Sequence, residues 1–518
     1  MAILQSMRAL VERNERLHGD DCHLIYGEQR RTFRQFAERA RRLASGLYQL
    51  GVRHQDRVAI LAMNCPEYLD VYGAGEVSGY IIAPVNFRLA PAEILYVLAS
   101  AAPTVLVFEQ QYSAVIEQLR GQLPGVQTFV CIGDSPPAWA QPFETVLAAG
   151  SPEGPPLSPQ LGDIVSLMYT SGTTGRPKGV MLTHEGMLAL CESWAFELGA
   201  DVGDKILLSM PFFHIGARSQ GGAVTLRGGT IVMHRNFDPV AILQTVQRER
   251  VTQIHLAPTM VQAVLGVPDQ ESYDLSSLQT LNYAAAPMPI TLLTRAMQRF
   301  GPIMINGYGQ TEGAGTVLRK RYHRPQGSAK DLKRLTSIGQ PTLDARVRIV
   351  DELDNELPAT VVGEICLRSA QNMLGYWNDS AATLRTLRGG WLHTGDMGYM
   401  DEDGFVYLVD RKKDMIISGG ENIYSREVEE ALLAHPALAD VAVIGIPDAY
   451  WGEAVKGVVV VKAGMQVTAA ELIAHCRQLI ASYKCPKSVE FVDALPRLPS
   501  GKLNKVVLRE TYAGGGSG

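Results

Sequence analysis

The chain has 518 residues, of which 48 are lysine or arginine and 53 are aspartate or glutamate, giving a formal net charge of −5. This near balance argues against nucleic acid or an anionic membrane as the main partner, because either would favour a clear excess of basic residues. A chain of this length is expected to form more than one compact core. No apolar run reaches the roughly 18 residues that a membrane-spanning helix needs.

The first residues and the cysteines indicate the compartment. The segment 1–13 carries scattered charges and lacks the apolar stretch of a signal peptide. The seven cysteines lie far apart without metal-ligand spacing, so we expect reduced, half-buried thiols. These features predict a cytoplasmic protein.

Short β-branched runs alternate with longer amphipathic stretches through most of the chain. Strands are expected over 57–62, 104–108, 164–168 and 229–233, helices over 33–50 and 239–249, and a loop over the Pro-, Gly- and Ser-rich stretch 151–162. Such alternation predicts an α/β fold with largely parallel sheets.

The order of elements changes after about residue 410. We expect a helix over 427–434, strands over 440–446 and 457–461, a helix over 469–481 opened by a capping box at Thr468 and Glu471, and a strand over 488–492. The sequence therefore predicts a large N-terminal domain of layered α/β sheets (1–410) and a smaller, mobile α+β domain (411–513). The last residues, 514–518, are Gly-rich and are expected to be a flexible tail or a remnant of cloning.

The most informative segment is 169–179, which reads Tyr-Thr-Ser-Gly-Thr-Thr-Gly-Arg-Pro-Lys-Gly. Small residues let backbone N–H groups approach phosphate oxygens, while hydroxyls and a lysine add donors and charge. It is not a Walker A loop, because Pro177 and Gly179 flank the lysine. The residues expected to bind nucleotide phosphates are Thr170, Ser171, Gly172, Thr173, Thr174, Gly175 and Lys178.

Further motifs follow this loop in a fixed order. They are Pro211–His214, Asn306–Glu312, Trp391–Asp396, Asp410–Asp414 with Ser418–Glu421, and Pro499–Lys502. The ordered set resembles the adenylate-forming superfamily, which includes acyl-CoA synthetases, adenylation domains of peptide synthetases and firefly-type luciferases. The resemblance covers residues 8 to 512.

The resemblance implies a role for each motif. Tyr308 stacks on adenine, whose wall is formed by Ala285, Ala286 and Pro287; Thr311 bonds the α-phosphate and Glu312 holds Mg²⁺; Asp396 and Arg411 contact the ribose. His214 gates the acyl pocket, Gly419 and Gly420 line the coenzyme A channel, Lys413 is the hinge, and Lys502 is the catalytic cation of the first step. A lysine between an attacking carboxylate and a triphosphate lowers the barrier electrostatically.

The implied function is that of an ATP-dependent, AMP-forming acyl-CoA ligase. A carboxylic acid reacts with ATP to give an acyl-adenylate and pyrophosphate; the C-terminal domain rotates, and coenzyme A displaces AMP. The expected ligands are the acid, ATP, Mg²⁺ and coenzyme A, with no nucleic acid; a homodimer stays open.

Three alternatives compete with this function. A stand-alone adenylation enzyme would load a carrier protein, but the amino-acid-activating version lacks its expected aspartate in 215–217. A luciferase is compatible with the superfamily, although no feature of the sequence favours it. A catalytically idle nucleotide-binding module is disfavoured by the presence of Lys502 and Glu312.

The acid itself is not named by any motif. The pocket is expected to be lined by residues around 213–218, 283–287 and 307–316, where small side chains leave room for a medium- or long-chain fatty acid or an aryl acid. Arg218 departs from the apolar residue expected there, and we expect it to point to solvent rather than to pair with the substrate.

Overall fold

The computed structural model describes residues 6–170, 177–284, 288–411, 414–418, 421–448, 451–497 and 503–513. Packing divides the chain into two units, Met1–Val347 with Leu367–Leu392, and Arg348–Cys366 with His393–Gly518. The boundary at residue 411 and the mobility of the segment that follows it stay predictions.

One sheet of the first unit has eight strands within the described residues, in the order β19-β9-β8-β4-β3-β5-β6-β7. Their bounds are β3 (Arg57–Leu61), β4 (Ile81–Pro84), β5 (Val105–Glu109), β6 (Thr128–Ile132), β7 (Gln141–Pro142), β8 (Ile164–Thr170), β9 (Lys178–Thr183) and β19 (Gly375–Tyr376). The pairs from β8 through β7 are parallel, whereas β9 and β19 extend the sheet in antiparallel fashion.

A second sheet of the same unit has nine strands within the described residues, in the order β16-β15-β14-β13-β12-β10-β11-β1-β2. Their bounds are β1 (Cys22–Tyr26), β2 (Gln29–Thr32), β10 (Lys205–Leu208), β11 (Thr230–Met233), β12 (Gln253–Leu256), β13 (Thr280–Tyr283), β14 (Met304–Gln310), β15 (Gly313–Leu318) and β16 (Gln340–Pro341). The central pairs are parallel, so both sheets confirm the predicted α/β class.

The helices of the first unit cover these sheets. They are α1 (Met7–His18), α2 (Phe33–Gln49), α3 (Pro66–Ser78), α4 (Pro91–Ala101), α5 (Ser113–Leu119), α6 (Phe143–Ala149), α7 (His184–Leu198), α8 (Ile215–Leu226), α9 (Pro239–Glu249), α10 (Pro258–Leu265), α11 (Ile290–Phe300), α12 (Ala329–Arg334) and α13 (Ser380–Thr386). Local chemistry sets their starts: Thr32 and Gln35 form a capping box for α2, and Asp238 caps α9 ahead of a proline at its first position.

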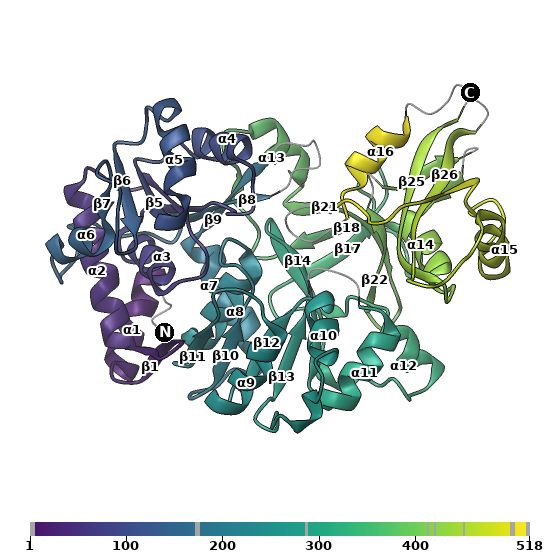
Figure 1. Cartoon of the computed structure of the whole chain (residues 1–518), viewed down its shortest axis with the longest axis horizontal. Coiled ribbons are helices and arrows are strands. Elements are labelled where there is room, and N and C mark those ends of the chain that lie inside the picture. The colour runs from purple at the N-terminus through teal and green to yellow at the C-terminus, as the bar shows by residue number, and fades with distance from the viewer. Residues whose placement is uncertain are drawn as a thin grey trace. The chain divides into compact units, whose positions relative to one another are not determined.

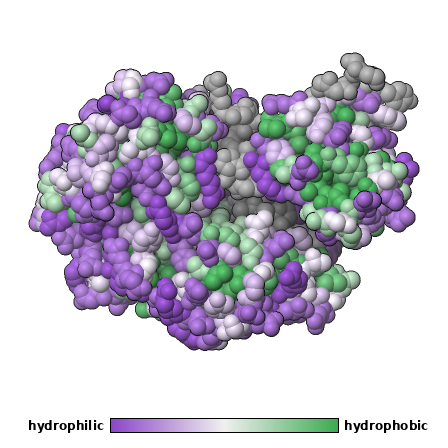
Figure 2. Space-filling model, in the orientation of Figure 1, coloured by the Kyte–Doolittle hydropathy of each residue, from purple (hydrophilic) through white to green (hydrophobic). Residues whose placement is uncertain are grey.

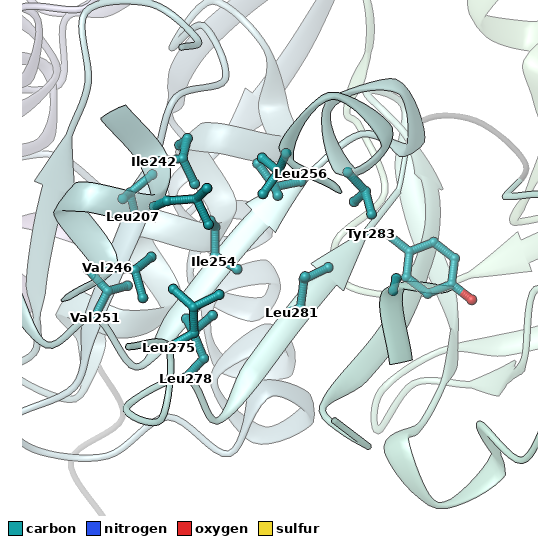
Figure 3. Close-up of a cluster of buried hydrophobic side chains, with 14 of the residues drawn as sticks. Leu207, Ile242, Val246, Val251, Ile254, Leu256, Leu275, Leu278, Leu281 and Tyr283 are labelled. Carbon is teal, nitrogen blue, oxygen red and sulfur yellow. The ribbon is translucent and has the colours of Figure 1, made fainter. Parts of the chain in front are cut away.

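Helices α9, α10 and α11 pack on one face of the nine-stranded sheet (Figure 1). Ile254 on β12 and Leu281 on β13 point into this core beside Ile242 and Val246 of α9 (Figure 3). Because side chains alternate along a strand, the residues between them face the other side. That second face is covered by α8, which packs against β10 and β11.

The second unit has its own small core. Its main elements are β23 (Ile416–Ser418), β24 (Glu421–Ile423), β25 (Leu438–Asp448), β26 (Gly452–Val461), β27 (Ser488–Phe491), α14 (Ser425–Leu433), α15 (Ala469–Leu479) and α16 (Lys505–Ala513). The predicted capping box at Thr468 and Glu471 opens α15, and Leu472 and Cys476 of that helix are fully buried. The predicted helix–strand order after residue 410 is confirmed to within a few residues at most element ends; β25 and β26 begin earlier than expected.

A further sheet has the order β17-β18-β21-β20, with β22 paired to β21. The bounds are β17 (Arg346–Val350), β18 (Gly363–Arg368), β20 (Leu387–Arg388), β21 (Trp391–Met400) and β22 (Val406–Arg411). No helix among the described residues is long and apolar enough to cross a membrane. Figure 2 shows hydrophilic residues over most of the visible face.

The seven cysteines all lie within the described residues and are free thiols. Six are buried and Cys22 is half-buried, so the thiols are more deeply placed than expected. Burial raises the pKa of the Cys191 thiol to about 12, which keeps it protonated and unreactive.

Arg218 corrects one expectation. It does not point to solvent: it lies on α8 with 8% of its surface exposed and forms a buried ion pair with Glu76 of α3. Its guanidinium also lies 4.4 Å from the centre of the Tyr72 ring. An apolar environment requires a partner for a buried charge, and α3 supplies that partner more than a hundred residues earlier in the chain.

Replacing Arg218 by alanine should lower the free energy of unfolding by about 3–5 kcal/mol, because the Glu76 carboxylate would stay buried without its partner. Arg120→Ala is the matched control, since Arg120 pairs with Glu117 at 3.0 Å in a largely exposed setting and should cost less than about 1 kcal/mol. Urea denaturation of both variants measures the difference. Equal losses would contradict a buried, matched pair.

Candidate active site

The strands that flank the predicted phosphate loop are paired antiparallel. Thr170 at the end of β8 lies opposite Lys178 at the start of β9, and Tyr169 lies opposite Gly179. A side chain on Gly179 would meet Leu167 at 2.9 Å, so glycine permits the close approach at this point. The two predicted phosphate-binding residues Thr170 and Lys178 therefore stand side by side where the loop leaves the sheet.

A tight hairpin presents Thr311 and Glu312. Strand β14 runs through Gly307, Tyr308 and Gly309 to Gln310, which pairs with Gly313 at the start of β15. Most of the motif Asn306–Glu312 thus lies within β14, because β15 pairs with that strand as far as Gln310. Only Thr311 and Glu312 form the turn.

Tyr376 on β19 connects these two places. Its hydroxyl donates a 2.9 Å hydrogen bond to Oε1 of Glu312, and Nζ of Lys178 lies 5.0 Å from the centre of its ring. The backbone holds the tyrosine in position, because β19 pairs with β9 and the Tyr376 N–H donates to Thr383 Oγ1 at 2.9 Å. One tyrosine therefore contacts a cation through its ring and a carboxylate through its hydroxyl, and the two partners come from different sheets.

The electrostatics of this cluster suit a polyphosphate. Burial, and next the Glu312 charge, raise the pKa of the Tyr376 phenol, so the hydroxyl stays a donor throughout the physiological range. Glu312 is 9% exposed, and its backbone carbonyl accepts a 2.8 Å bond from the Met373 N–H, which fixes the turn.

Glu312 fits the expected role toward Mg²⁺. The tyrosine holds one carboxylate oxygen, which orients the group toward a hard cation that binds carboxylate and phosphate oxygens together. The described residues contain no cluster of three or more His, Cys, Asp or Glu that could hold a metal.

The predicted ribose contacts lie in the second unit. Asp396 of β21 and Arg411 of β22 are directly opposite in the antiparallel register. Asp396 is 1% exposed, and its N–H donates to Thr394 Oγ1 at 3.1 Å. The preceding Gly395 has φ +69°, a left-handed conformation that favours glycine.

His214 forms the N-terminal boundary of α8. Its ring centre lies 4.4 Å from that of Phe213, which in turn meets Phe87 edge-on at 5.4 Å. The histidine thus stands in an aromatic cluster at the entrance to the helix, a position compatible with the predicted gate.

Many predicted site residues lie outside the described residues, and their roles stay predictions. They are Ser171, Gly172, Thr173, Thr174, Gly175, Ala285, Ala286, Pro287, Lys413, Gly419, Gly420 and Lys502. Sequence reasoning missed Tyr376, which lies 64 residues from Glu312. The only local signal was the aromatic pair Tyr376-Trp377, which has no spacing typical of a site.

Comparisons with known proteins cover nearly the whole chain. The family model "AMP-binding enzyme" matches residues 11–377, and "AMP-binding enzyme C-terminal domain" matches 427–502. A feruloyl-CoA synthase from an Amycolatopsis species is 40% identical over 98% of this chain and 99% of its own. The medium/long-chain-fatty-acid–CoA ligase FadD8 of Mycobacterium tuberculosis is 36% identical over 96% and 88%. The structure of the amide bond synthetase McbA from Marinactinospora thermotolerans matches with a TM-score of 0.87 at 29% identity over 98% and 100%.

Tyr376→Phe should lower kcat/KM for ATP by about tenfold or more, because a hydrogen bond to a charged group contributes about 1.5–3 kcal/mol. Tyr80→Phe is the matched control: it removes a buried hydroxyl that donates to the Ala44 carbonyl at 3.0 Å, away from Glu312. Steady-state kinetics at varied ATP measures both. Similar kcat/KM values for the two variants would show that Tyr376 has a purely structural role.

Proposed function

The chain belongs to the acyl-CoA synthetase branch of the adenylate-forming AMP-binding enzyme family, and on this premise we propose that it is an AMP-forming acid–coenzyme A ligase. The observation that carries the proposal is the convergence of Lys178 and Glu312 on Tyr376. Tyr376 then contacts both Lys178, which would bind phosphate, and Glu312, whose carboxylate would suit a hard cation.

The first step joins the acid to AMP. A carboxylate oxygen of the acid attacks the α-phosphorus of ATP in line, the bond to the bridging oxygen breaks, and pyrophosphate leaves with its electron pair. Lys178 and Thr311 would bind phosphate oxygens, and Lys502 would lie between the two anions, where a placed cation is typically worth about 3–4 kcal/mol. Mg²⁺, when bound with ATP near Glu312, would neutralise phosphate charge.

The second step transfers the acyl group to the thiol. The sulfur of coenzyme A attacks the carbonyl carbon, the mixed anhydride bond breaks, and AMP leaves while the thiol proton passes to solvent. We propose that the C-terminal segment turns about Lys413 between the steps, which takes Lys502 away and brings Gly419 and Gly420 to the channel. Excluding water protects the reactive anhydride.

The acid and the acceptor are the finer parts of the proposal. Feruloyl-CoA synthase is named for an aryl acid and FadD8 for fatty acids. We therefore propose both classes of acid as candidate substrates of this chain. Similarity to an amide bond synthetase supports an amine as the competing acceptor, and a carrier-protein thiol is the other alternative.

AMP formation with a panel of aryl and fatty acids, with and without coenzyme A, tests the proposed function. We expect pyrophosphate release with the correct acid and AMP release that depends on coenzyme A. Acid-dependent AMP release with an amine but not with coenzyme A would assign the chain to amide synthesis. No acid-dependent pyrophosphate release would leave a nucleotide-binding module.

Asp396→Ala should raise KM for ATP about tenfold or more, because ribose hydrogen bonds to a carboxylate are made in both the ground state and the transition state. Asp401→Ala is the control: Asp401 lies in the turn of the same hairpin and accepts bonds from Asp403 and Phe405 N–H groups. An ATP dependence that is the same in both variants would remove Asp396 from the nucleotide site.

Lys502→Ala and Lys413→Pro should separate the two half-reactions. We expect Lys502→Ala to slow adenylate formation by about two to three orders of magnitude, as loss of a placed charge donor does. A supplied acyl-adenylate should still react with coenzyme A. Lys413→Pro fixes φ near about −65° and should block thioester formation alone.

Single-turnover assays of each half-reaction measure these effects. The outcome that contradicts rotation is an equal slowing of both steps by Lys502→Ala. A static site that holds the lysine on the ligand throughout would then be the better account.

A further inference from the structure

The loop that joins β10 to α8 carries the predicted gate His214 and folds into a turn. The His214 N–H donates to the Pro211 carbonyl at 3.1 Å, and the His214 carbonyl accepts from the Arg218 N–H at 3.4 Å. These two bonds fix the shape of the turn, because they are made within the loop and the first turn of α8. Its position relative to the rest of the first unit has to be set by contacts from other segments.

Asn64 supplies three of those contacts from the connection between β3 and α3, and it is 2% exposed. Its Oδ1 accepts the Phe212 N–H at 2.9 Å, and its Nδ2 donates to the carbonyls of Met210 and His234, both at 3.0 Å. Only this orientation of the amide satisfies two carbonyls and one N–H. Met210 and His234 follow the parallel neighbours β10 and β11, so one side chain after β3 ties the ends of two strands of the other sheet.

Tyr72 of α3 bonds the second backbone group of Phe212. Its hydroxyl, in a side chain that is 2% exposed, donates to the Phe212 carbonyl at 2.7 Å. Burial raises the pKa of the Tyr72 phenol, so the hydroxyl stays a donor at physiological pH. The Arg218–Glu76 pair lies against the same ring and helps to orient it. Phe212 thus has its carbonyl and its N–H bonded by side chains 140 and 148 residues away in the chain.

Side-chain packing alone does not fix Phe212. A cavity of about 40 Å³ lies beside it, lined also by Tyr72 and Arg218 and by the glycines Gly221 and Gly222 of α8. That volume exceeds what one water molecule needs, so the phenylalanine lacks close-packed neighbours on this side. The bonds from Asn64 and Tyr72 therefore hold the loop where packing leaves it room to shift.

A shift of Phe212 would reach the predicted gate directly. His214 is two residues further along the same turn, and its ring centre lies 4.4 Å from that of Phe213. Phe213 in turn meets the ring of Phe87, which follows β4, edge-on at 5.4 Å. The position of the imidazole thus depends on a loop that side chains of the eight-stranded sheet's connections hold from one side.

We infer that Asn64 and Tyr72 are positioning residues, which hold the Phe212 backbone so that His214 stays at the edge of the acyl pocket. This inference rests on the proposed function, in which His214 gates that pocket. The residues proposed to bind phosphate lie on β9 and in the turn between β14 and β15, away from this loop. Loosening the loop should therefore weaken binding of the acid and leave binding of ATP unchanged.

Tyr72→Phe removes only the hydroxyl. In acid-dependent ATP–pyrophosphate exchange, with cinnamic and decanoic acids as probes, KM for the acid should rise about three- to tenfold, as expected when one hydrogen bond is lost and fewer molecules hold the gate in place. KM for ATP should not change. Tyr80→Phe is the matched control, since its buried hydroxyl donates to the Ala44 carbonyl at 3.0 Å, and it should leave both KM values unchanged. Equal changes in the two KM values of Tyr72→Phe, or no change, would overturn the inference.

His214→Ala distinguishes positioning from a general loss of stability. If Tyr72 acts through His214, adding Tyr72→Phe to His214→Ala should change KM for the acid by less than about twofold, because the group that it positions is gone. A further three- to tenfold rise in the double variant would contradict the inference. So would a His214→Ala variant whose KM for the acid equals that of the wild type.

Asn64→Ala removes three bonds and should raise KM for the acid at least as much as Tyr72→Phe, with the same dependence on His214. If Asn64→Ala does not fold, Tyr72→Phe in the two backgrounds still decides. Wild-type exchange with neither probe, nor with any acid of a wider panel, would overturn the proposed function and this inference with it. Wild-type exchange that is intact, with an unchanged KM for the acid in Tyr72→Phe, would overturn the inference alone.

Discussion

The contact of Tyr376 with Glu312 and Lys178 is the interaction on which the arrangement of the first unit's candidate site depends. Lys178 begins β9 in one sheet, whereas Glu312 lies in the turn between β14 and β15 in the other. The tyrosine lies on β19, whose backbone extends the first sheet, and its hydroxyl reaches the second. Its raised pKa keeps that hydroxyl protonated, so the bond persists as pH rises through the neutral range.

The buried cation Arg218 of the first unit, unlike Lys178, is neutralised by a carboxylate. Arg218 is placed where the acid was expected to bind, yet Glu76 neutralises it and the Tyr72 ring covers it. A buried pair of this kind costs desolvation free energy and contributes little net stability, although either partner alone would be strongly destabilising. Arg218 is therefore a matched charge, because Glu76 occupies its guanidinium.

The proposed first step depends on charge held at a fixed place in the first unit. That step requires positive charge that is already in place, and Lys178 is the cation that lies beside the Tyr376 ring. The antiparallel pair of Asp396 and Arg411 places two further polar residues together in the second unit, where the family resemblance assigns ribose recognition.

The sequence by itself determined the α/β class, the capping box that opens α15 and the family, because these depend on local periodicity, capping and contiguous motifs. It did not indicate how far β14 runs: the strand continues to Gln310 because β15 pairs with it, and that pairing is not a local property of the sequence. Only the tertiary structure decided the partners. Arg218 was expected to point to solvent, but α3 brings Glu76 to it, and Tyr376, which belongs to no motif, bonds Glu312. Each contact joins segments far apart in the chain, and neither composition nor local spacing indicates which segments the fold brings together.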